Sequence, residues 1–443
     1  MSLSPSYRKI WEISWPLLIG MLAEHTVGVV DTAFLGHVGE VELGASAIAG
    51  TFYIILFVVG MGFGIGTQIL IARRNGEKDY ASIGGIFENS LYFIWLFSAA
   101  VIALSFIFSR EILGFMLHSE DILDASMRFL NIRIFSLFFA LGCVIMRSFF
   151  VGIQVTKYIG LGAFITAGSN LILDYLLIFG KFGFPEMGIE GAALASLLAE
   201  VAGFGFFIYI IVKRIDLAKY QLLTFKKPQL KIVSHTLNLS VFTMFQNLLS
   251  LGSWFLFFVI IEKTGEKNLA ASNIVRSFYV LALCPIWAYG SAVSTLVSNA
   301  IGAKQRHHVF RIIRRVVVFG LATSIVAFIP IAVSAKGIMS LYTNSAELID
   351  MGFKALYVVG IATIMNSVAW IIFSAISATG NTMIALFIES FTLLCYLGSV
   401  YFFAIQFPNH LEIIWSAEFV YQILIGLISV LYLRSNHWVK KEI

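Results

Sequence analysis

Two acidic residues lie inside long apolar stretches of this chain. Asp31 falls within residues 28–36, and Asp174 follows Asn170 by four residues in a second stretch. A spacing of four places Asn170 and Asp174 on one face of a helix. Two carboxylates and a carboxamide offer hard oxygen ligands for Na⁺, and two carboxyls that neighbour each other in an apolar setting can also share one proton. These residues predict a Na⁺ or proton site, with a structural pair of hydrogen-bonded acids as the alternative.

Further charged residues occur in the same apolar surroundings. Glu24 precedes Asp31 by two helical turns on one face, and it is either a second proton station or part of the lining of a wet cavity. Glu200 is either an interior partner or an acid that faces the cytoplasm. Arg133 and Arg276 are intramembrane cations, expected to pair with acids or backbone carbonyls or to contact substrate.

No motif of a motor or of a familiar enzyme accompanies these charges. The chain has no Gly-x-x-x-x-Gly-Lys-[Ser/Thr] P-loop, and His-x-x-His, Cys-x-x-Cys and Gly-x-Ser-x-Gly are absent too. Gly60, Gly62, Gly64 and Gly66 resemble a dinucleotide loop, but they lie in an apolar helical stretch, which favours close helix packing. The three widely spaced cysteines predict neither disulfides nor a zinc site. We expect no enzyme activity and no cofactor beyond the coupling ion.

The elements that must position the acids are membrane-spanning helices. Of the 443 residues, 59% are hydrophobic and 12% are charged, against about 25% charged in a soluble domain. A bilayer core needs about 20 apolar residues per helix, and continuously apolar runs exclude the alternation of barrel strands. The chain is therefore predicted to be an all-α integral membrane protein with twelve helices. They are expected at residues 10–36, 43–72, 83–109, 125–151, 157–180, 188–213, 234–261, 269–300, 309–335, 346–377, 382–406 and 412–434.

The two halves of the chain align under one shift of 226 positions. The shift places residues 64–76 on residues 290–302 and Thr156 on Thr382. Because each half holds an even number of helices, the repeats are expected to be parallel six-helix bundles, related by a pseudo-two-fold axis along the membrane normal. The predicted organisation is an N-lobe, a basic cytoplasmic linker and a C-lobe, over residues 1–214, 215–232 and 233–443.

The deep polar residues of the second half are interpreted as neutral. Under the shift, Asp31 and Asp174 correspond to Phe257 and Val400, so we expect ion coupling in the first half. The 41 Phe and 8 Trp residues can supply cation-π contacts to flat organic cations. The remaining candidates for the substrate cavity, or simply for helix packing, are Gln246, Asn247, Asn273, Asn366 and Arg276.

Lys and Arg residues concentrate on one side of the predicted spans, the side that holds the N-terminus. Because cytoplasmic loops are enriched in these residues, a multi-pass protein of the cell membrane with both termini in the cytoplasm is expected. The formal charge of +5 fits basic loops that face anionic lipid and is no argument for nucleic acid. No cleavable signal peptide is expected, because the first apolar stretch is too long and carries Glu24 and Asp31.

Several segments together resemble the multidrug and toxic compound extrusion (MATE) family, and its DinF-like branch in particular. They are Trp15-Pro16 with residues 31–36, residues 188–196 and residues 375–382. The resemblance covers essentially the whole chain. It implies two six-helix lobes that export a substrate in exchange for inward Na⁺ or H⁺.

The resemblance also implies roles for individual residues. Pro16 matches a proline of helix 1 proposed to bend when the cation site is protonated. Ser196 replaces the family's usual threonine, with four extra residues before it. The NorM-like branch has acids in helices 7 and 10, where this chain has Gln246 and Asn366, so no cation site is implied in the second lobe. The first-lobe cation site falls on Asp31, Asn170, Asp174, Ala192 through its backbone carbonyl, and Ser196.

We therefore predict a secondary active antiporter that exports organic cations or drugs against H⁺ or Na⁺ by alternating access. It is expected to act as a monomer surrounded by lipid, without a nucleic-acid partner. A flippase for a lipid-linked saccharide is the alternative within the same superfamily, because Arg133 and Arg276 suit an anionic head group. An intramembrane enzyme would need a nucleophile and base or a metal cluster, and a channel would need no coupling acids.

Overall fold

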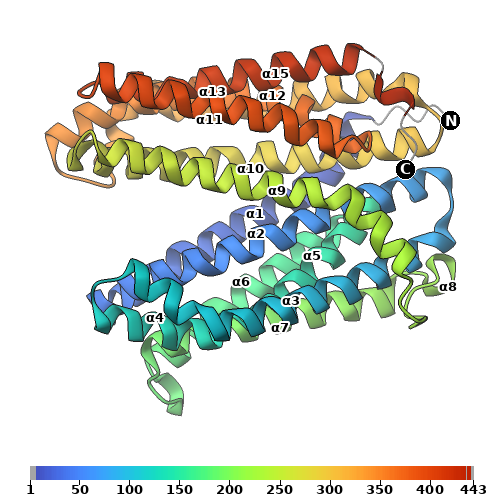
Figure 1. Cartoon of the computed structure of the whole chain (residues 1–443), viewed down its shortest axis with the longest axis horizontal. Helices are drawn as coiled ribbons and strands as arrows, with labels where there is room; N and C mark the ends of the chain where they lie inside the picture. The colour runs from blue at the N-terminus through green and yellow to red at the C-terminus, as the bar shows by residue number, and fades with distance from the viewer. Residues whose placement is uncertain (1–5, 436, 441–443) are drawn as a thin grey trace. The chain divides into compact units, whose positions relative to one another are not determined.

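A computed structural model describes residues 6–435 and 437–440, which form helices joined by short loops (Figure 1). Short 3-10 turns occur at Lys181–Gly183, Arg306–His308 and His437–Lys440. The α-helices are α1 (Tyr7–Gly36), α2 (Glu40–Glu77), α3 (Tyr80–Met116), α4 (Glu120–Arg133), α5 (Ser136–Gly152), α6 (Lys157–Ile178), α7 (Gly188–Arg214), α8 (Leu217–Tyr220), α9 (Leu230–Glu262), α10 (Glu266–Gly302), α11 (Val309–Ser340), α12 (Ala346–Ala378), α13 (Thr382–Gln406), α14 (Leu411–Trp415) and α15 (Ala417–Arg434).

The described helices provide up to twelve candidate membrane spans, by length and composition, when one bent helix pair is counted as a single span. Eleven helical segments of the described chain are long and apolar enough to cross a bilayer. The twelfth span is the pair α4 and α5, which meet at a bend of 48°. The predicted all-α membrane fold is confirmed. The break within the span expected at residues 125–151 was not foreseen, and it lies directly after Arg133.

The repeat is visible as matching helix boundaries. A shift of 226 positions moves the first residue of α2, Glu40, onto Glu266, the first residue of α10. It moves the span Glu120–Gly152, formed by α4 and α5, onto the single helix α12, Ala346–Ala378. The same span is therefore broken in the first half and continuous in the second.

The helices pack into two compact units. The N-terminal unit comprises residues 15–244, and the C-terminal unit comprises residues 245–443 together with the start of the chain up to Ser14. The dividing points fall inside α1 and α9, since each of these helices belongs partly to each unit. The lobe limits expected from helix order, 1–214, 215–232 and 233–443, remain a prediction.

Glycine residues allow the backbone of α2 to pack directly against neighbouring helices within the N-terminal unit. A Cβ atom on Gly62 would lie 2.6 Å from the Met244 backbone of α9, and one on Gly60 would lie 2.6 Å from the Leu141 side chain of α5. Thr243 donates a hydrogen bond to the Gly62 carbonyl oxygen at 2.7 Å across the same contact. The glycine run therefore serves helix packing, as its apolar surroundings predicted.

Candidate functional site

Two parallel helices bring Asp31 and Asp174 to the same level of the N-terminal unit. A Cβ atom on Gly160 of α6 would lie 3.4 Å from the Pro16 carbonyl oxygen of α1, and one on Gly20 would lie 3.6 Å from the Ala163 side chain. Asp31 and Asp174 follow these contacts by similar numbers of residues, and every residue adds about 1.5 Å of rise. The two carboxyl groups are accordingly electrostatic neighbours.

The antiparallel helix α7 packs closely against α6 at the level of this candidate site. A Cβ atom on Gly191 would lie 2.6 Å from the Leu177 carbonyl oxygen, and one on Gly203 would contact the Thr166 hydroxyl. Along α6, Asp174 lies between these two contacts and nearer the first of them. Asp174 is therefore level with the first turns of α7. Ala192 and Ser196, which the resemblance placed in the site, are both buried in this part of α7.

Several buried polar atoms of this site have no hydrogen-bond partner that the structure's donors supply among the described residues. The atoms concerned are Asp31 Oδ1, both carboxylate oxygens of Asp174, and both polar atoms of the Asn170 side chain. Asp174 is 0% exposed and Asn170 is 2% exposed, so bulk water does not supply the missing bonds. Native proteins leave few buried polar groups unpaired. A set of carboxylate and amide oxygens in this condition suits a Na⁺ ion or a proton.

Arg133 is the cation that neighbours the acid pair. Its charge interacts with both Asp31 and Asp174, and its guanidinium lies over the Tyr53 ring of α2 at 4.3 Å from the centroid. It also donates to Ser136 Oγ at 2.8 Å, across the break between α4 and α5. The broken span therefore holds a fixed positive charge beside the two carboxyls.

A second acid and arginine extend this polar region. Glu24 of α1 forms an ion pair with Arg147 of α5. The charge of Glu200 on α7 interacts with both Arg147 and Arg133. Glu24 and Glu200 thus belong to one electrostatic network. Arg147 was not among the predicted residues, although it lies in the same apolar stretch, 125–151, as Arg133.

The polar residues expected in the second half do not form a comparable group in the C-terminal unit. Gln246 and Asn366 are buried, with an unpartnered side-chain oxygen on each. Asn273 donates to the Leu269 carbonyl oxygen of its own helix at 3.1 Å, and Asn247 is half-buried. Arg276 is exposed and lies 5.1 Å from the centroid of the Phe258 ring.

The interpretation of the second half as neutral is wrong. Glu389 of α13 is 0% exposed and Glu418 of α15 is 7% exposed, so both glutamates lie inside the C-terminal unit. Each occurs in a predicted apolar span, and the rule that selected Asp31 applies to them equally. They are not at the positions equivalent to Asp31 and Asp174 under the shift, which are Phe257 and Val400.

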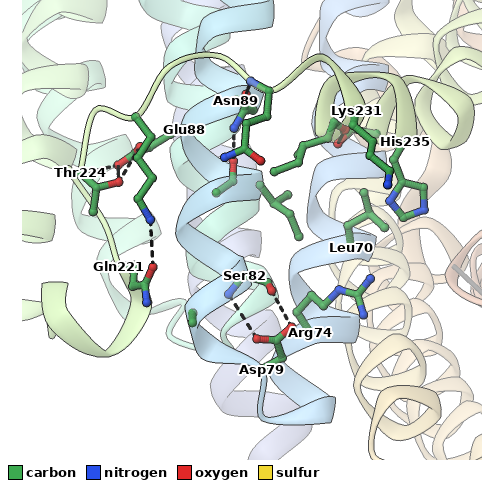
Figure 2. A pocket seen from close by; sticks show the side chains of 17 residues that line it. Leu70, Arg74, Asp79, Ser82, Glu88, Asn89, Gln221, Thr224, Lys231 and His235 are labelled. Carbon is green, nitrogen blue, oxygen red and sulfur yellow. Dashed lines mark hydrogen bonds between the residues drawn. The ribbon is translucent and has the colours of Figure 1, made fainter.

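A cavity of about 570 Å³ lies elsewhere in the N-terminal unit, near the turn between α2 and α3. Figure 2 shows Arg74, Asp79, Lys231 and His235 on its walls, with Glu88 and Thr224 hydrogen-bonded at one side. This turn is at the end of α2 opposite the turn that follows α1. At 1.5 Å per residue, the 38 residues of α2 span roughly 57 Å. The cavity is therefore distinct from the site around Asp31.

Known proteins resemble this chain over nearly its whole length. The probable multidrug resistance protein NorM of Thermotoga maritima is 24% identical, with 99% of this chain and 95% of that protein covered. The multidrug export protein MepA of Staphylococcus aureus is 23% identical, with coverage of 85% and 83%.

Solved structures share the fold. One is described as the outward-facing conformation of a multidrug resistance MATE family transporter of the MOP superfamily; its TM-score is 0.91 at 18% identity, with 99% of this chain and 98% of that chain covered. A variant of the Vibrio cholerae MATE transporter VcmN has a TM-score of 0.91 at 20% identity, with full coverage of both chains. The MatE family model matches residues 16–176 and again residues 243–402. This multi-pass membrane protein, with one match in each half, therefore belongs to the MatE family of multidrug and toxic compound extrusion proteins.

Proposed function

We propose that this protein is a secondary active antiporter that exports organic cations or drugs in exchange for Na⁺ or H⁺ by alternating access. Its family, together with the names of the relatives NorM and MepA as multidrug proteins, supports drug export. The coupling site is the group formed by Asp31, Asn170, Asp174, Ala192 and Ser196 in the N-terminal unit.

The unpartnered atoms around Asp174 carry the proposal. One oxygen of Asp31, both oxygens of Asp174 and the Asn170 amide receive no hydrogen bond from a donor of the described residues. A charged group inside a membrane is costly, and such residues usually serve ions or protons. One bound Na⁺ or proton would reduce the repulsion between the two carboxylates and would give their oxygens a partner.

Arg133 gives the site a way to respond to the bound ion. When the ion leaves, the acid pair gains negative charge and attracts the neighbouring guanidinium more strongly. Arg133 lies directly before the break between α4 and α5, so its movement would alter the bend. Pro16, which lacks a backbone N–H, provides a second flexible point at the close contact of α1 and α6.

The substrate is proposed to be an organic cation held by aromatic and neutral polar groups. Gln246, Asn247, Asn273 and Asn366 offer neutral polar side chains, while Glu24 and Glu200 offer negative charge. Arg276 would favour substrates that carry an acceptor beside their positive charge. Both termini are placed in the cytoplasm, and the protein is proposed to act as a monomer in lipid.

Transport in proteoliposomes tests the proposal. Ethidium movement is measured against an imposed Na⁺ gradient and, separately, against an imposed pH gradient. We expect one gradient to drive the wild type, and Asp31→Asn and Asp174→Asn each to lower coupled transport at least tenfold. Asp350→Asn is the matched control, because this exposed acid pairs only with Lys336 at the surface. If the two site variants still couple, the proposed site is wrong. If the wild type moves no dye under either gradient, the export of organic cations is contradicted.

A further inference from the structure

Glu389 is a carboxyl group in the interior of the C-terminal unit, and no cation of the described residues pairs with it. It lies on α13 and is 0% exposed. None of the ion pairs formed by the described residues includes it. An ionised carboxylate in such surroundings is strongly unfavourable unless a proton, a cation or several hydrogen-bond donors compensate the charge.

The Ser250 hydroxyl contacts two oxygen atoms but can donate a hydrogen to only one of them. Ser250 Oγ of α9 donates to the Gln246 carbonyl oxygen at 2.9 Å, one helical turn back, and it also makes a short contact with Glu389 Oε1. A serine hydroxyl carries a single hydrogen. When the carbonyl oxygen takes that hydrogen, the contact with Glu389 needs a hydrogen from the carboxyl group itself.

Two further oxygens in the same place also lack a donor. Glu389 Oε2 and Gln246 Oε1 are buried and make no hydrogen bond to any described residue. The Gln246 side chain, 8% exposed, lies close to Glu389. Both atoms are acceptors, and buried acceptors without donors are rare in proteins. One proton on Glu389 turns the carboxyl into a donor and removes its charge.

Glu418 shows the opposite arrangement within the same unit. Its Oε2 accepts a hydrogen bond from the Tyr279 hydroxyl at 2.8 Å, and its Oε1 accepts one from the Tyr396 hydroxyl at 3.0 Å. The protein itself thus supplies a donor to each oxygen of Glu418. Tyr421 of α15 is the titratable neighbour of Glu389, and it also neighbours Glu418. The groups that α9 presents to Glu389 are the neutral side chains of Gln246 and Ser250.

We propose that Glu389 is a second ion-coupling group of this transporter, binding one proton between Gln246 and Ser250 in the conformation described here. The proton leaves when a change of conformation opens the space between α9 and α13 to water. The role of this proton in transport rests on the proposed antiport function, whereas the protonated state of the carboxyl does not.

Infrared spectroscopy of the purified full-length protein in lipid nanodiscs tests the protonated state. At neutral pH we expect the carbonyl band of protonated carboxylic acids in the wild type to contain a component that Glu389→Gln removes, separate from any contribution of Asp31 and Asp174. Glu418→Gln is the matched control and should keep that component, as should Asp31→Asn and Asp174→Asn. If Glu389→Gln leaves the neutral-pH spectrum unchanged in this region, the carboxyl is ionised and the proposal is overturned. A carboxylate band of Glu389 that responds to added Na⁺ would equally overturn it, in favour of a metal-ion site.

Transport tests the role of this proton separately from the antiport proposal. Glu389→Gln keeps the size and neutrality of the protonated side chain, so we expect wild-type binding of ethidium but at least a tenfold loss of dye transport driven by a pH gradient. Wild-type transport by Glu389→Gln under that gradient would show that no coupled proton resides there. If only Na⁺ drives the wild type, the antiport proposal stands and the role of Glu389 is refuted.

Discussion

Glu24 of α1 and Arg147 of α5 form an ion pair that joins two helices 123 positions apart in sequence. Arg147 also interacts electrostatically with Glu200, and Glu200 interacts with Arg133 beside the acid pair. The charges of this region therefore alternate in sign from α1 to the site. A change at one charge is felt by its neighbours, because the apolar surroundings screen these interactions less than bulk water does.

The two members of this ion pair are expected to differ in importance. Glu24→Gln leaves Arg147 beside Glu200 and should cost about 1 kcal/mol or less, since the Glu24 side chain is 53% exposed. Arg147→Gln removes the cation shared by two acids and should lower stability more. Thermal unfolding in detergent, followed by size-exclusion chromatography, measures both variants. The double variant Glu24→Gln/Arg147→Gln should unfold at a higher temperature than Arg147→Gln alone, because it leaves one acid fewer without its cation. A lower unfolding midpoint for the double variant would contradict the shared role of Arg147.

The close contact of α2 and α9 predicts a strong effect of one methyl group. Gly62→Ala places a Cβ atom against the Met244 backbone, which cannot move aside as a side chain can. We expect a loss of about 1 to 3 kcal/mol from overpacking. Gly50→Ala on the same helix is the control, because nothing lies within 4 Å of its Cβ position, and it should be neutral or slightly stabilising. Equal melting temperatures for the two variants would refute the packing role of Gly62.

We expect Glu88 of α3 to anchor the segment that precedes α9. Its carboxylate accepts hydrogen bonds from the Thr224 backbone N–H at 2.6 Å and from the Thr224 hydroxyl at 3.1 Å (Figure 2). Glu88→Ala removes both bonds, so trypsin should cleave after Lys226 several times faster than in the wild type; the Lys227–Pro228 bond resists trypsin in every variant. Glu88→Gln keeps an acceptor and should be cleaved at nearly the wild-type rate.

The control for this cleavage experiment is Asp79→Ala. Asp79 lines the same cavity, but among the described residues its side chain bonds within its own turn, to the Ser82 backbone N–H and hydroxyl. Cleavage that accelerates equally in Asp79→Ala and Glu88→Ala would indicate general loosening of this region and would count against a specific anchor.

The predicted orientation can be tested with introduced cysteines. Lys227→Cys lies in the basic segment before α9, and Lys263→Cys lies in the exposed turn after it. A membrane-impermeant maleimide should label Lys263→Cys in intact cells and Lys227→Cys only after permeabilisation. The native Cys143 and Cys284 are buried and should give little background. The reverse labelling pattern would place both termini outside.

Hydropathy alone determined the spans and their repetition, because a helix must bury its backbone polar groups wherever it meets lipid. It also identified Asp31, Asn170 and Asp174, since a charge in an apolar stretch needs compensation whatever the fold. The same rule applies to Arg147, Glu389 and Glu418, which also lie in apolar stretches, so the sequence carries a signal for them too.

Tertiary packing decided which of these residues meet. The contacts of Glu24 with Arg147 and of Ser250 with Glu389 join helices far apart in the chain, and periodicity along one helix carries no information about its neighbours. The break after Arg133 and the division of α1 and α9 between two units have the same origin. Hydropathy records only that a helix is apolar, whereas packing determines which helix, side chain or hydrogen-bond donor lies against each of its faces.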